Sequence, residues 1–477
     1  MSVPRTIAAG GSVRHALSRA GERPLLLDRE GHARTGGELT SRTERVAGAL
    51  ARRNLAGRRV GVIYRNSFAA FEAFLAVEWL GATRVTVDPD VPPAEARAIF
   101  DAAGVDAVLA DQEHAHSLGG DTLVHDDEAP LVGSPWREEP AVAADLPLVV
   151  YPRQVAGGKL FGVTMSYGNW DATMRINCEL FQQGWYGPVL GTNERMLTVQ
   201  QLMHGTGMVA SFPFLIMGLP QVVLPRFDAE AVLEVILEQR VTTTFGVPGM
   251  LTRLADRLGD GVDLPLRHTL YGGAPLAVAE LRRIRRTLGP SLVQLYGRFE
   301  AGWPLAVLGP NEHAAILNGD DDLATSCGKF IPQVEARLGE APGRPDGYGE
   351  LQTRNPMVSP DYADPEGWCA LGDVAYLDPG GYVHLAGRLD GMINTGSYHV
   401  YPGQVAEAIG AVSGVADVQV VGEPDPVWGE AVTAYVVPDD PTLWDDLIQR
   451  LGAELPTKLA RYKIPKRYHQ VAQLPGP

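Results

Sequence analysis

The strongest constraint on the fold is an alternation of helix-like and strand-like segments near the N-terminus. Three segments have the apolar character of buried strands, at residues 59–64, 82–87 and 107–110. Helical segments precede or separate them, at residues 36–54, 68–80 and 92–103. Alternation of this kind predicts a parallel sheet that is covered by helices on both faces. We therefore expect an α/β fold.

Length and charge limit the class of protein. A chain of 477 residues is too long for one ordinary core, so we expect roughly two to four core units. With 45% hydrophobic and 21% charged residues, the composition is that of a globular protein and not of a disordered one. The formal net charge of -16 argues against an extended surface for nucleic acid or anionic membrane. We expect no nucleic-acid partner.

The cysteines and the apolar runs indicate the cellular compartment. Cys178, Cys327 and Cys369 lie far apart and fit neither a metal-ligand spacing nor a disulfide framework. No apolar run reaches the roughly 18 residues that a membrane-spanning helix needs, and the N-terminus has no apolar core of a signal peptide. The sequence predicts a cytoplasmic protein without a membrane span.

Residues 368–409 contain a hairpin flanked by charged residues. Short β-type runs at 374–377 and 382–385 are joined by an Asp-Pro-Gly-Gly turn. Asp373 precedes the first run, and Arg388 and Asp390 follow the second. A carboxylate can accept hydrogen bonds from a ribose, and an arginine can hold a phosphate or a diol beside it. Local chemistry alone also allows a plain surface salt bridge.

The motif around this hairpin resembles the signature of the adenylate-forming (ANL) superfamily. The matching pattern is Gly-Asp, Asp after four residues, Gly-Tyr, Gly-Arg-x-Asp, x-Ile, Gly and Pro, within WCALGDVAYLDPGGYVHLAGRLDGMINTGSYHVYPGQ. This superfamily contains acyl-CoA and aryl-CoA synthetases, adenylation domains of peptide synthetases, and luciferases. The resemblance implies that Asp373 and Arg388 hold the ribose of a nucleotide and that Asp390 is a hinge between two domains.

The resemblance also implies an architecture. A large N-terminal domain, residues 1–389, is expected to consist of doubly wound αβα sheets and a small β-barrel-like subdomain. A small mobile α+β domain, residues 390–477, is expected to follow, and it is shorter than in the family. Relatives continue past the final Leu-Pro to a lysine that bridges carboxylate and α-phosphate, and no lysine of this sequence matches it.

Further motifs imply a nucleotide site. The Gly272-Gly273-Ala274 step matches the adenine and acyl contact of the family, and Tyr296-Gly297 matches a tyrosine that stacks near adenine. Glu300 matches the glutamate that binds Mg²⁺ in relatives. The threonine that donates to a phosphate oxygen in relatives is Phe299 here.

An acid pocket is implied by Met203-His204-Gly205 and the segment after it. In acyl and aryl ligases the residue that matches His204 lies beside the bound carboxylate, whereas amino-acid-specific relatives have an Asp near this position. An α-amino acid is therefore disfavoured as substrate. The predicted walls of the acyl pocket are Phe245, Gly246, Val247, Met250 and Trp303.

The phosphate loop departs from the family pattern. Relatives have a run of glycine and hydroxyl residues, which bind pyrophosphate oxygens through backbone N–H groups and side chains. This chain has PRQVAGGKLFGV after Tyr151, one residue longer than expected. Arg153, Lys159 and Arg298 are the candidates for replacing the lost phosphate contacts.

Two functions follow from this mixture of matches and departures. The first is a carboxylic-acid ligase that makes an acyl-AMP with ATP and Mg²⁺ and transfers the acyl group to CoA, a carrier-protein thiol or another nucleophile. In this function His204, Glu300 and Arg388 are the catalytic residues. The second is a relative that binds acyl-CoA or an adenylate without cleaving ATP. The partners in either case are a small carboxylic acid or acyl thioester, with an acyl carrier protein as an alternative acceptor.

Overall fold

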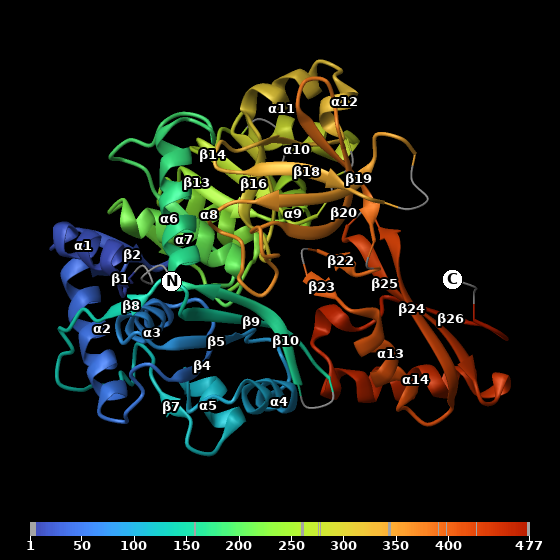
Figure 1. Cartoon of the computed structure of the whole chain (residues 1–477), viewed down its shortest axis with the longest axis horizontal. Coiled ribbons are helices and arrows are strands. Elements are labelled where there is room, and N and C mark those ends of the chain that lie inside the picture. The colour runs from blue at the N-terminus through green and yellow to red at the C-terminus, as the bar shows by residue number, and fades with distance from the viewer. Residues whose placement is uncertain are drawn as a thin grey trace.

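The structure, a computed structural model, describes residues 6–156, 159–258, 262–274, 276, 278–341, 345–389, 391–396, 398–425 and 427–474. The chain forms a large α/β part with a small domain at its C-terminal end (Figure 1). Within the described ranges, no helix is both long and apolar enough to cross a bilayer.

The alternation near the N-terminus builds a six-stranded sheet, ordered β10-β9-β5-β4-β6-β7, as predicted. Its strands are β4 (Arg59–Ile63), β5 (Thr83–Val87), β6 (Ala107–Ala110), β7 (Leu123–Val124), β9 (Pro147–Ala156) and β10 (Lys159–Ser166). Its connections include α2 (Gly36–Ala51), α3 (Phe68–Trp79), α4 (Pro93–Ala103) and α5 (Gln112–Leu118). All neighbouring strands are parallel except β10, which is antiparallel to β9.

Local capping explains where two of these helices begin. Thr35 and Glu38 form a reciprocal capping box at the start of α2. The Ser67 side chain accepts a hydrogen bond from the Ala70 backbone N–H at the start of α3. Every residue of α3 is buried, because this helix packs inside the first core against α2 and the sheet.

The segment that stands in place of the family's phosphate loop is a strand through Ala156. Its residues pair with β10, and the register shifts where Pro152 lies opposite Gly162. Pro152 has no N–H to donate, and a bulge is where a sheet tolerates proline. A Cβ on Gly162 would lie 2.4 Å from the Tyr151 carbonyl oxygen, so only glycine fits here. Residues 152–156 contain no glycine, since the first glycine after Tyr151 is Gly157, so this segment lacks the residue type that would favour a loop and continues the strand.

A second, larger sheet carries most of the remaining chain, with the order β18-β19-β20-β21-β17-β16-β15-β14-β13-β11-β12-β2-β3. Its strands are β2 (Pro24–Leu27), β3 (Ala33–Thr35), β11 (Met196–Thr198), β12 (Gln221–Val223), β13 (Thr243–Gly246), β14 (His268–Gly272), β15 (Leu292–Arg298), β16 (Gly302–Leu308), β17 (Ser326–Phe330), β18 (Glu335–Gly339), β19 (Gly349–Arg354), β20 (Cys369–Leu377) and β21 (Tyr382–Arg388). The β-barrel-like region of the prediction corresponds to the antiparallel strands β16–β21, which continue this sheet.

Helices and a small two-stranded sheet complete the large part. The helices are α1 (Gly11–Ala20), α6 (Tyr167–Gln182), α7 (Gly205–Ile216), α8 (Ala229–Glu238), α9 (Pro248–Leu258), α10 (Val278–Leu288), α11 (Pro310–Leu317) and α12 (Asp321–Ala324). The two-stranded sheet pairs β1 (Thr6–Ala8) with β8 (Ala141–Ala143). Apolar side chains of α6 and of the second sheet share one buried cluster.

The small domain has its own sheet and core. Its strands are β22 (Ile393–Thr395), β23 (Tyr398–Val400), β24 (Val415–Asp425), β25 (Gly429–Pro438) and β26 (Arg467–Gln470), with helices α13 (Pro402–Gly410) and α14 (Trp444–Lys458). Short 3₁₀ turns lie at Pro441–Leu443 and Arg461–Lys463. Apolar residues from 393 to 468 form its core. The boundary at residues 389/390 stays a prediction, and Asp390 itself lies outside the described residues.

One buried ion pair joins the small domain to the first sheet region. Lys463 Nζ lies 2.5 Å from Glu95 Oε1 on α4, and the Ala460 backbone N–H donates to Glu95 Oε2 at 2.9 Å. Both charged side chains are buried, at 3% and 9% exposure. Removing one partner of a buried pair leaves an uncompensated charge, which typically costs about 3–5 kcal/mol.

We expect Glu95→Gln to loosen the contact between the small domain and the large part, because Lys463 would keep its charge without a carboxylate. Hydrogen exchange should then become faster in the segment 459–464, while Asp101→Asn, on the exposed side of the same helix, should change nothing. Equal exchange in the wild type and Glu95→Gln would show that this pair does not hold the small domain in place.

Candidate functional site

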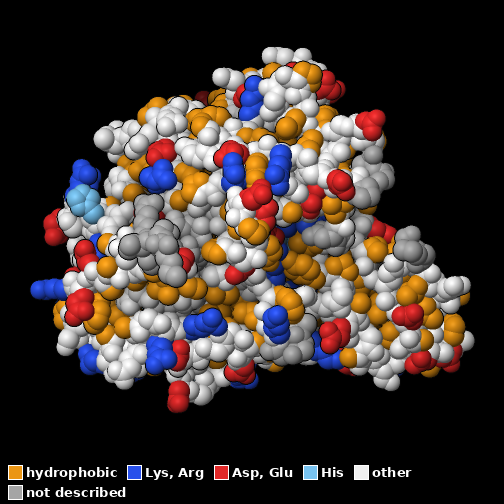
Figure 2. All heavy atoms as spheres, viewed as in Figure 1, with side chains coloured by type: hydrophobic (Ala, Val, Ile, Leu, Met, Phe, Trp, Pro, Cys, Tyr) orange, Lys and Arg blue, Asp and Glu red, His pale blue; other side chains and the backbone are white. Residues whose placement is uncertain are grey.

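A cavity of about 1520 Å³ lies between the large part and the small domain. Its walls include the carboxyl ends of the parallel strands β5 and β14, together with β15 and the β22–β23 hairpin. Ligands of open α/β sheets bind at such strand ends. Figure 2 shows hydrophobic side chains along the boundary where the small domain meets the large part. The volume exceeds that of a typical small-ligand pocket, so there is room for more than one chemical group.

Asp373 is the centre of one polar cluster in this cavity. Arg388 Nη1 donates to Asp373 Oδ1 at 2.6 Å, and the Tyr296 hydroxyl donates to Asp373 Oδ2 at 2.6 Å. The pairing of Asp373 with Arg388 across β20 and β21 follows directly from the hairpin register. Burial and the neighbouring Asp373 raise the pKa of Tyr296 well above its usual value, so its hydroxyl stays a donor. The structure thus brings Tyr296, which was predicted from a different motif, to the pair of Asp373 and Arg388.

Glu300 is the centre of a second cluster. Its Oε1 lies 2.6 Å from Arg153 Nη1 and 3.0 Å from Arg298 Nη2. The three side chains are only 11%, 8% and 6% exposed for Arg153, Arg298 and Glu300 respectively. Burial alone would raise the pKa of Glu300. The positive charges of Arg298 and Arg153 nevertheless lower this pKa well below its usual value. Glu300 is therefore ionised and doubly paired.

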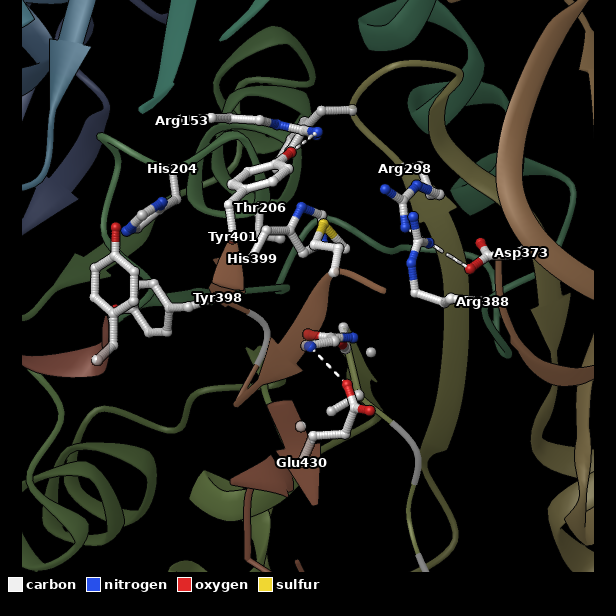
Figure 3. Close-up of a pocket in the computed structure, with 18 of the residues that line it drawn as sticks. Arg153, His204, Thr206, Arg298, Asp373, Arg388, Tyr398, His399, Tyr401 and Glu430 are labelled. Atoms are coloured by element: carbon white, nitrogen blue, oxygen red, sulfur yellow. Dashed lines mark hydrogen bonds and ion pairs between the residues drawn. The ribbon is translucent and has the colours of Figure 1, made fainter. Parts of the chain in front are cut away.

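Arg298 connects the two clusters. Its Nη1 lies 3.8 Å from Asp373 Oδ1, so Arg153, Glu300, Arg298, Asp373 and Arg388 form a continuous arginine–carboxylate chain. Figure 3 shows Arg298 beside Arg388 and Asp373, and Arg153 beside Tyr401. Three guanidiniums and two carboxylates leave one net positive charge, which suits a singly charged phosphate group.

His399 of the small domain lines the same cavity, and Figure 3 shows it beside Tyr401. Burial and the positive charges of Arg298 and Arg153 lower its pKa well below the usual value. Its imidazole is therefore neutral near pH 7 and adds no charge to the cavity. Among the described residues around His399, the positive charge therefore comes from the arginines alone.

Several polar atoms of residues at or beside the cavity are buried without a hydrogen-bond partner among the described residues. They are Arg153 Nη2, Arg298 Nε, Glu300 Oε2 and Trp303 Nε1. Buried polar atoms are nearly always satisfied, and exceptions point to a function or to a missing ligand or water. Three of these four atoms are donors, so a ligand rich in acceptor oxygens would satisfy them.

The Gly272-Gly273-Ala274 turn lines the cavity beside Tyr296 and Gly297, as the resemblance implied. It is also held by the small domain, because Asn394 Nδ2 donates to the Gly273 carbonyl oxygen at 2.6 Å. The Asn394 backbone N–H in turn donates to Glu430, whose side chain is visible in Figure 3. The predicted nucleotide contacts therefore surround one cavity, while their roles stay predictions.

His204 occupies the opposite end of the cavity. Its Nε2 lies 2.6 Å from Asp88 Oδ2, and its ring meets the Tyr398 ring edge-on at 5.1 Å. Burial alone would raise the pKa of Asp88. The hydrogen bond from His204 and its charge nevertheless lower this pKa below its usual value. Asp88 thereby orients the imidazole. His204 keeps about a third of its side chain exposed, so it can contact a ligand.

Phe299 fills the space beside His204. Its ring stacks on Tyr151 with a centroid distance of 5.2 Å. A Cβ on Gly205 would lie 1.8 Å from the Phe299 ring, so the absence of a side chain at Gly205 is what admits the ring. An aromatic ring now lies where relatives were expected to have a hydroxyl donor.

The predicted acyl wall is only partly at the cavity surface. Trp303 lines the cavity, and Phe245 packs edge-on against it at 5.1 Å from the outer side. Gly246, Val247 and Met250 are not among the described residues that line this cavity. Met250 instead has its sulfur 2.9 Å from Gln200 Nε2. The assignment of these residues to an acyl wall stays a prediction.

Asp88, Tyr398, His399 and Tyr401 line the cavity but were not predicted from the sequence. A signal existed for Asp88, because it directly follows the buried strand β5, and carboxyl ends of parallel strands carry functional residues. For the other three the signal was the run Tyr-His-Val-Tyr after the hinge motif. That run reads locally as an ordinary strand, and only the placement of the small domain brings it to the cavity.

The surroundings of Glu300 suit a guanidinium better than the divalent cation that the resemblance implies. A dication on Glu300 would lie against two guanidiniums that already contact its Oε1. Even two like unit charges about 4 Å apart repel by about 4 kcal/mol at an effective dielectric constant near 20. The residues present therefore do not fit Mg²⁺ at this point while both arginines remain in place.

Comparisons with known proteins identify relatives over almost the whole chain. The family model described as AMP-binding enzyme matches residues 13–153 and 158–363, and the model of the AMP-binding enzyme C-terminal domain matches residues 404–476. The gap at residues 154–157 falls in the segment that departs from the phosphate-loop pattern.

Individual relatives include CoA ligases. A feruloyl-CoA synthase of Amycolatopsis sp is 31% identical over 474 residues, which cover 93% of this chain and 91% of the relative. The medium/long-chain-fatty-acid–CoA ligase FadD8 of Mycobacterium tuberculosis is 33% identical over 71% of this chain. The match spans only 61% of FadD8, and 59% of a 2-succinylbenzoate–CoA ligase of Bacillus licheniformis.

A solved structure shares the fold along nearly the whole chain. The amide bond synthetase McbA of Marinactinospora thermotolerans is 27% identical, with a TM-score of 0.82 over 97% of this chain and 96% of McbA. An α/β fold with a large N-terminal part and a small C-terminal domain is therefore common to both proteins.

We expect Arg388→Ala to weaken the binding of AMP roughly 10- to 100-fold, because a charge-assisted contact beside Asp373 would be lost. Isothermal titration calorimetry measures this directly. Arg337→Ala is the matched control, since Arg337 lies in strand β18 of the same sheet and stacks on Trp368 outside the cavity. Unchanged AMP affinity in Arg388→Ala would mean that the ribose assignment is wrong.

Proposed function

Because the chain belongs to the AMP-binding enzyme family, we propose that it is a carboxylic-acid ligase of the adenylate-forming type. The observation that carries this proposal is the arginine–carboxylate chain, which joins the predicted ribose residues Asp373 and Arg388 to Arg298 and Arg153 beside one cavity. The relatives that are named as CoA ligases support the same reaction class.

In the proposed first step, a carboxylate oxygen of the acid attacks the α-phosphorus of ATP and pyrophosphate leaves. The protein's contribution to such a step is positioning and neutralisation of phosphate charge. Asp373 and Arg388 would hold the ribose, and Arg298 and Arg153 would face the α-phosphate. His204, oriented by Asp88, would lie beside the acid's carboxylate.

In the proposed second step, a nucleophile attacks the carbonyl carbon of the acyl-adenylate, the bond to phosphate oxygen breaks and AMP leaves. CoA is the acceptor that the named CoA ligases support, and a carrier-protein thiol or an amine are the other proposed acceptors. The small domain contributes Tyr398, His399 and Tyr401 to the cavity, so the acceptor would enter along its surface.

The acid is proposed to be aromatic or aliphatic. Trp303, backed by Phe245, gives the cavity a flat apolar wall, and Phe299 and Tyr151 give a second one. At the His204 end of the cavity Asp88 is paired with His204 and Glu95 is paired with Lys463, so neither of these two carboxylates is left free for an ammonium group. This agrees with the expectation that α-amino acids are not substrates.

A second candidate function is binding and transfer of a preformed adenylate or acyl-CoA without ATP cleavage. The paired strand β9 favours it, because backbone N–H groups within a ladder cannot cradle a triphosphate as a glycine-rich loop does. One net positive charge also suits an adenylate better than the several charges of ATP.

We expect ATP–pyrophosphate exchange with at least one member of a panel of aromatic and aliphatic acids, and none with α-amino acids. Titrations with AMP, ATP and CoA would accompany the exchange measurement, with Arg388→Ala as the inactive control. Absence of exchange with every acid, together with clear binding of AMP or CoA, would contradict the ligase and leave the second candidate.

A further inference from the structure

We propose that the Arg153 guanidinium takes the place of a divalent cation on Glu300, so that this protein binds the phosphate of its nucleotide ligand without a metal ion. The inference rests on the proposed function, because it assigns the phosphate-binding groups of the same nucleotide site. It goes beyond that function because it states that the site binds phosphate without a metal cofactor.

The fold holds Arg153 in this position from two directions. Arg153 belongs to β9, where pairing with β10 fixes the backbone on either side of it. Its Nη1 lies 2.6 Å from Glu300 Oε1 in the large part and 2.6 Å from the Tyr401 hydroxyl in the small domain. Figure 3 shows the Arg153 guanidinium directed at Tyr401 across the cavity. A positive charge is thus built in where relatives were expected to bind a metal.

Of the two cationic residues in the β9–β10 hairpin, the strand geometry places Arg153 at the cavity and Lys159 away from it. Lys159 is exposed, its Nζ lies 5.4 Å from the Phe161 ring centre, and it does not line the cavity. Arg153 lines the cavity and is almost completely buried. Arg153 is the extra residue of the bulge, between Pro152 and Gln154, which both pair with β10, and a loop at residues 152–156 would not hold it from both sides in this way.

Free donors remain on the same guanidiniums. Arg153 Nη2 and Arg298 Nε are buried and have no hydrogen-bond partner among the described residues. Each belongs to a side chain that is anchored on Glu300 through another nitrogen. Arginine side chains donate charge-assisted hydrogen bonds to phosphate oxygens, and they bind phosphate without a bridging cation.

Positive charge and the lack of space both oppose a metal ion beside Glu300 while Arg153 and Arg298 are paired with it. Glu300 Oε1 is shared by two guanidiniums, and the Phe299 ring occupies the adjoining space against Gly205 and Tyr151. Glu300 Oε2 is buried and unpartnered, but a dication bound to it would be repelled by both arginines. Arg153 would have to leave Glu300 before a metal ion could bind.

The test is calorimetric titration of the full chain with AMP and with ATP, once in the presence of Mg²⁺ and once with EDTA. We expect AMP to bind with the same affinity in both conditions, and ATP to bind in EDTA at least as tightly as with Mg²⁺. The readout is binding, so it does not depend on turnover.

Two variants distinguish the guanidinium from a metal site. Arg153→Gln should weaken AMP binding in EDTA roughly 10- to 100-fold, whereas Lys159→Ala, which removes a charge from the same hairpin, should leave it unchanged. Glu300→Gln should weaken AMP binding by the same factor with Mg²⁺ and with EDTA, because Arg153 and Arg298 lose the carboxylate that fixes them. Loss of a metal ligand would weaken binding only in the presence of Mg²⁺.

The outcomes separate this inference from the proposed function. Binding of AMP or ATP that requires Mg²⁺, with an effect of Glu300→Gln that is seen only when Mg²⁺ is present, would overturn the inference and leave the ligase proposal intact. No binding of AMP in either condition would overturn both. If Arg153→Gln does not fold, the wild-type comparison and Glu300→Gln still decide, because neither depends on that variant.

Discussion

Glu300 accepts two arginines on one oxygen, and the rest of the site depends on this shared contact. It fixes Arg153 and Arg298 side by side, and Arg298 carries the network on to Asp373 and Arg388. An unpaired charge at any of these buried positions would be costly, typically about 3–5 kcal/mol, so the members stabilise one another. The network leaves a single net positive charge, and Arg153 and Arg298 each keep a buried nitrogen without a hydrogen-bond partner among the described residues.

The small domain completes this site and is not merely attached to it. Tyr401 fixes the far side of Arg153, Asn394 binds the Gly273 carbonyl oxygen, and Tyr398 packs against His204. Its position in turn depends on the buried pair of Lys463 and Glu95. Movement of the small domain would therefore change both the nucleotide end and the acid end of the cavity together.

Much of the fold was predictable because periodicity and capping act locally. The helices at α2, α3 and α4 and the strands β4, β5 and β6 lie within a few residues of their predicted positions. Asp373 and Arg388 were predictable because one hairpin register pairs them.

Contacts between distant segments were not predictable, since no local pattern encodes them. Arg153 and Glu300 are far apart in the chain, and their pairing requires β9 to continue as a strand through Ala156. Likewise Tyr401 and His399 reach the cavity only through the placement of the small domain.

A crystal structure with ATP and Mn²⁺ would test the central claim most directly, because anomalous scattering locates manganese without ambiguity. We predict that Arg153 stays on Glu300, that Arg153 Nη2 and Arg298 Nε bind phosphate oxygens, and that no anomalous peak lies beside Glu300. A manganese ion coordinated by Glu300, with Arg153 displaced from the cavity, would contradict the account.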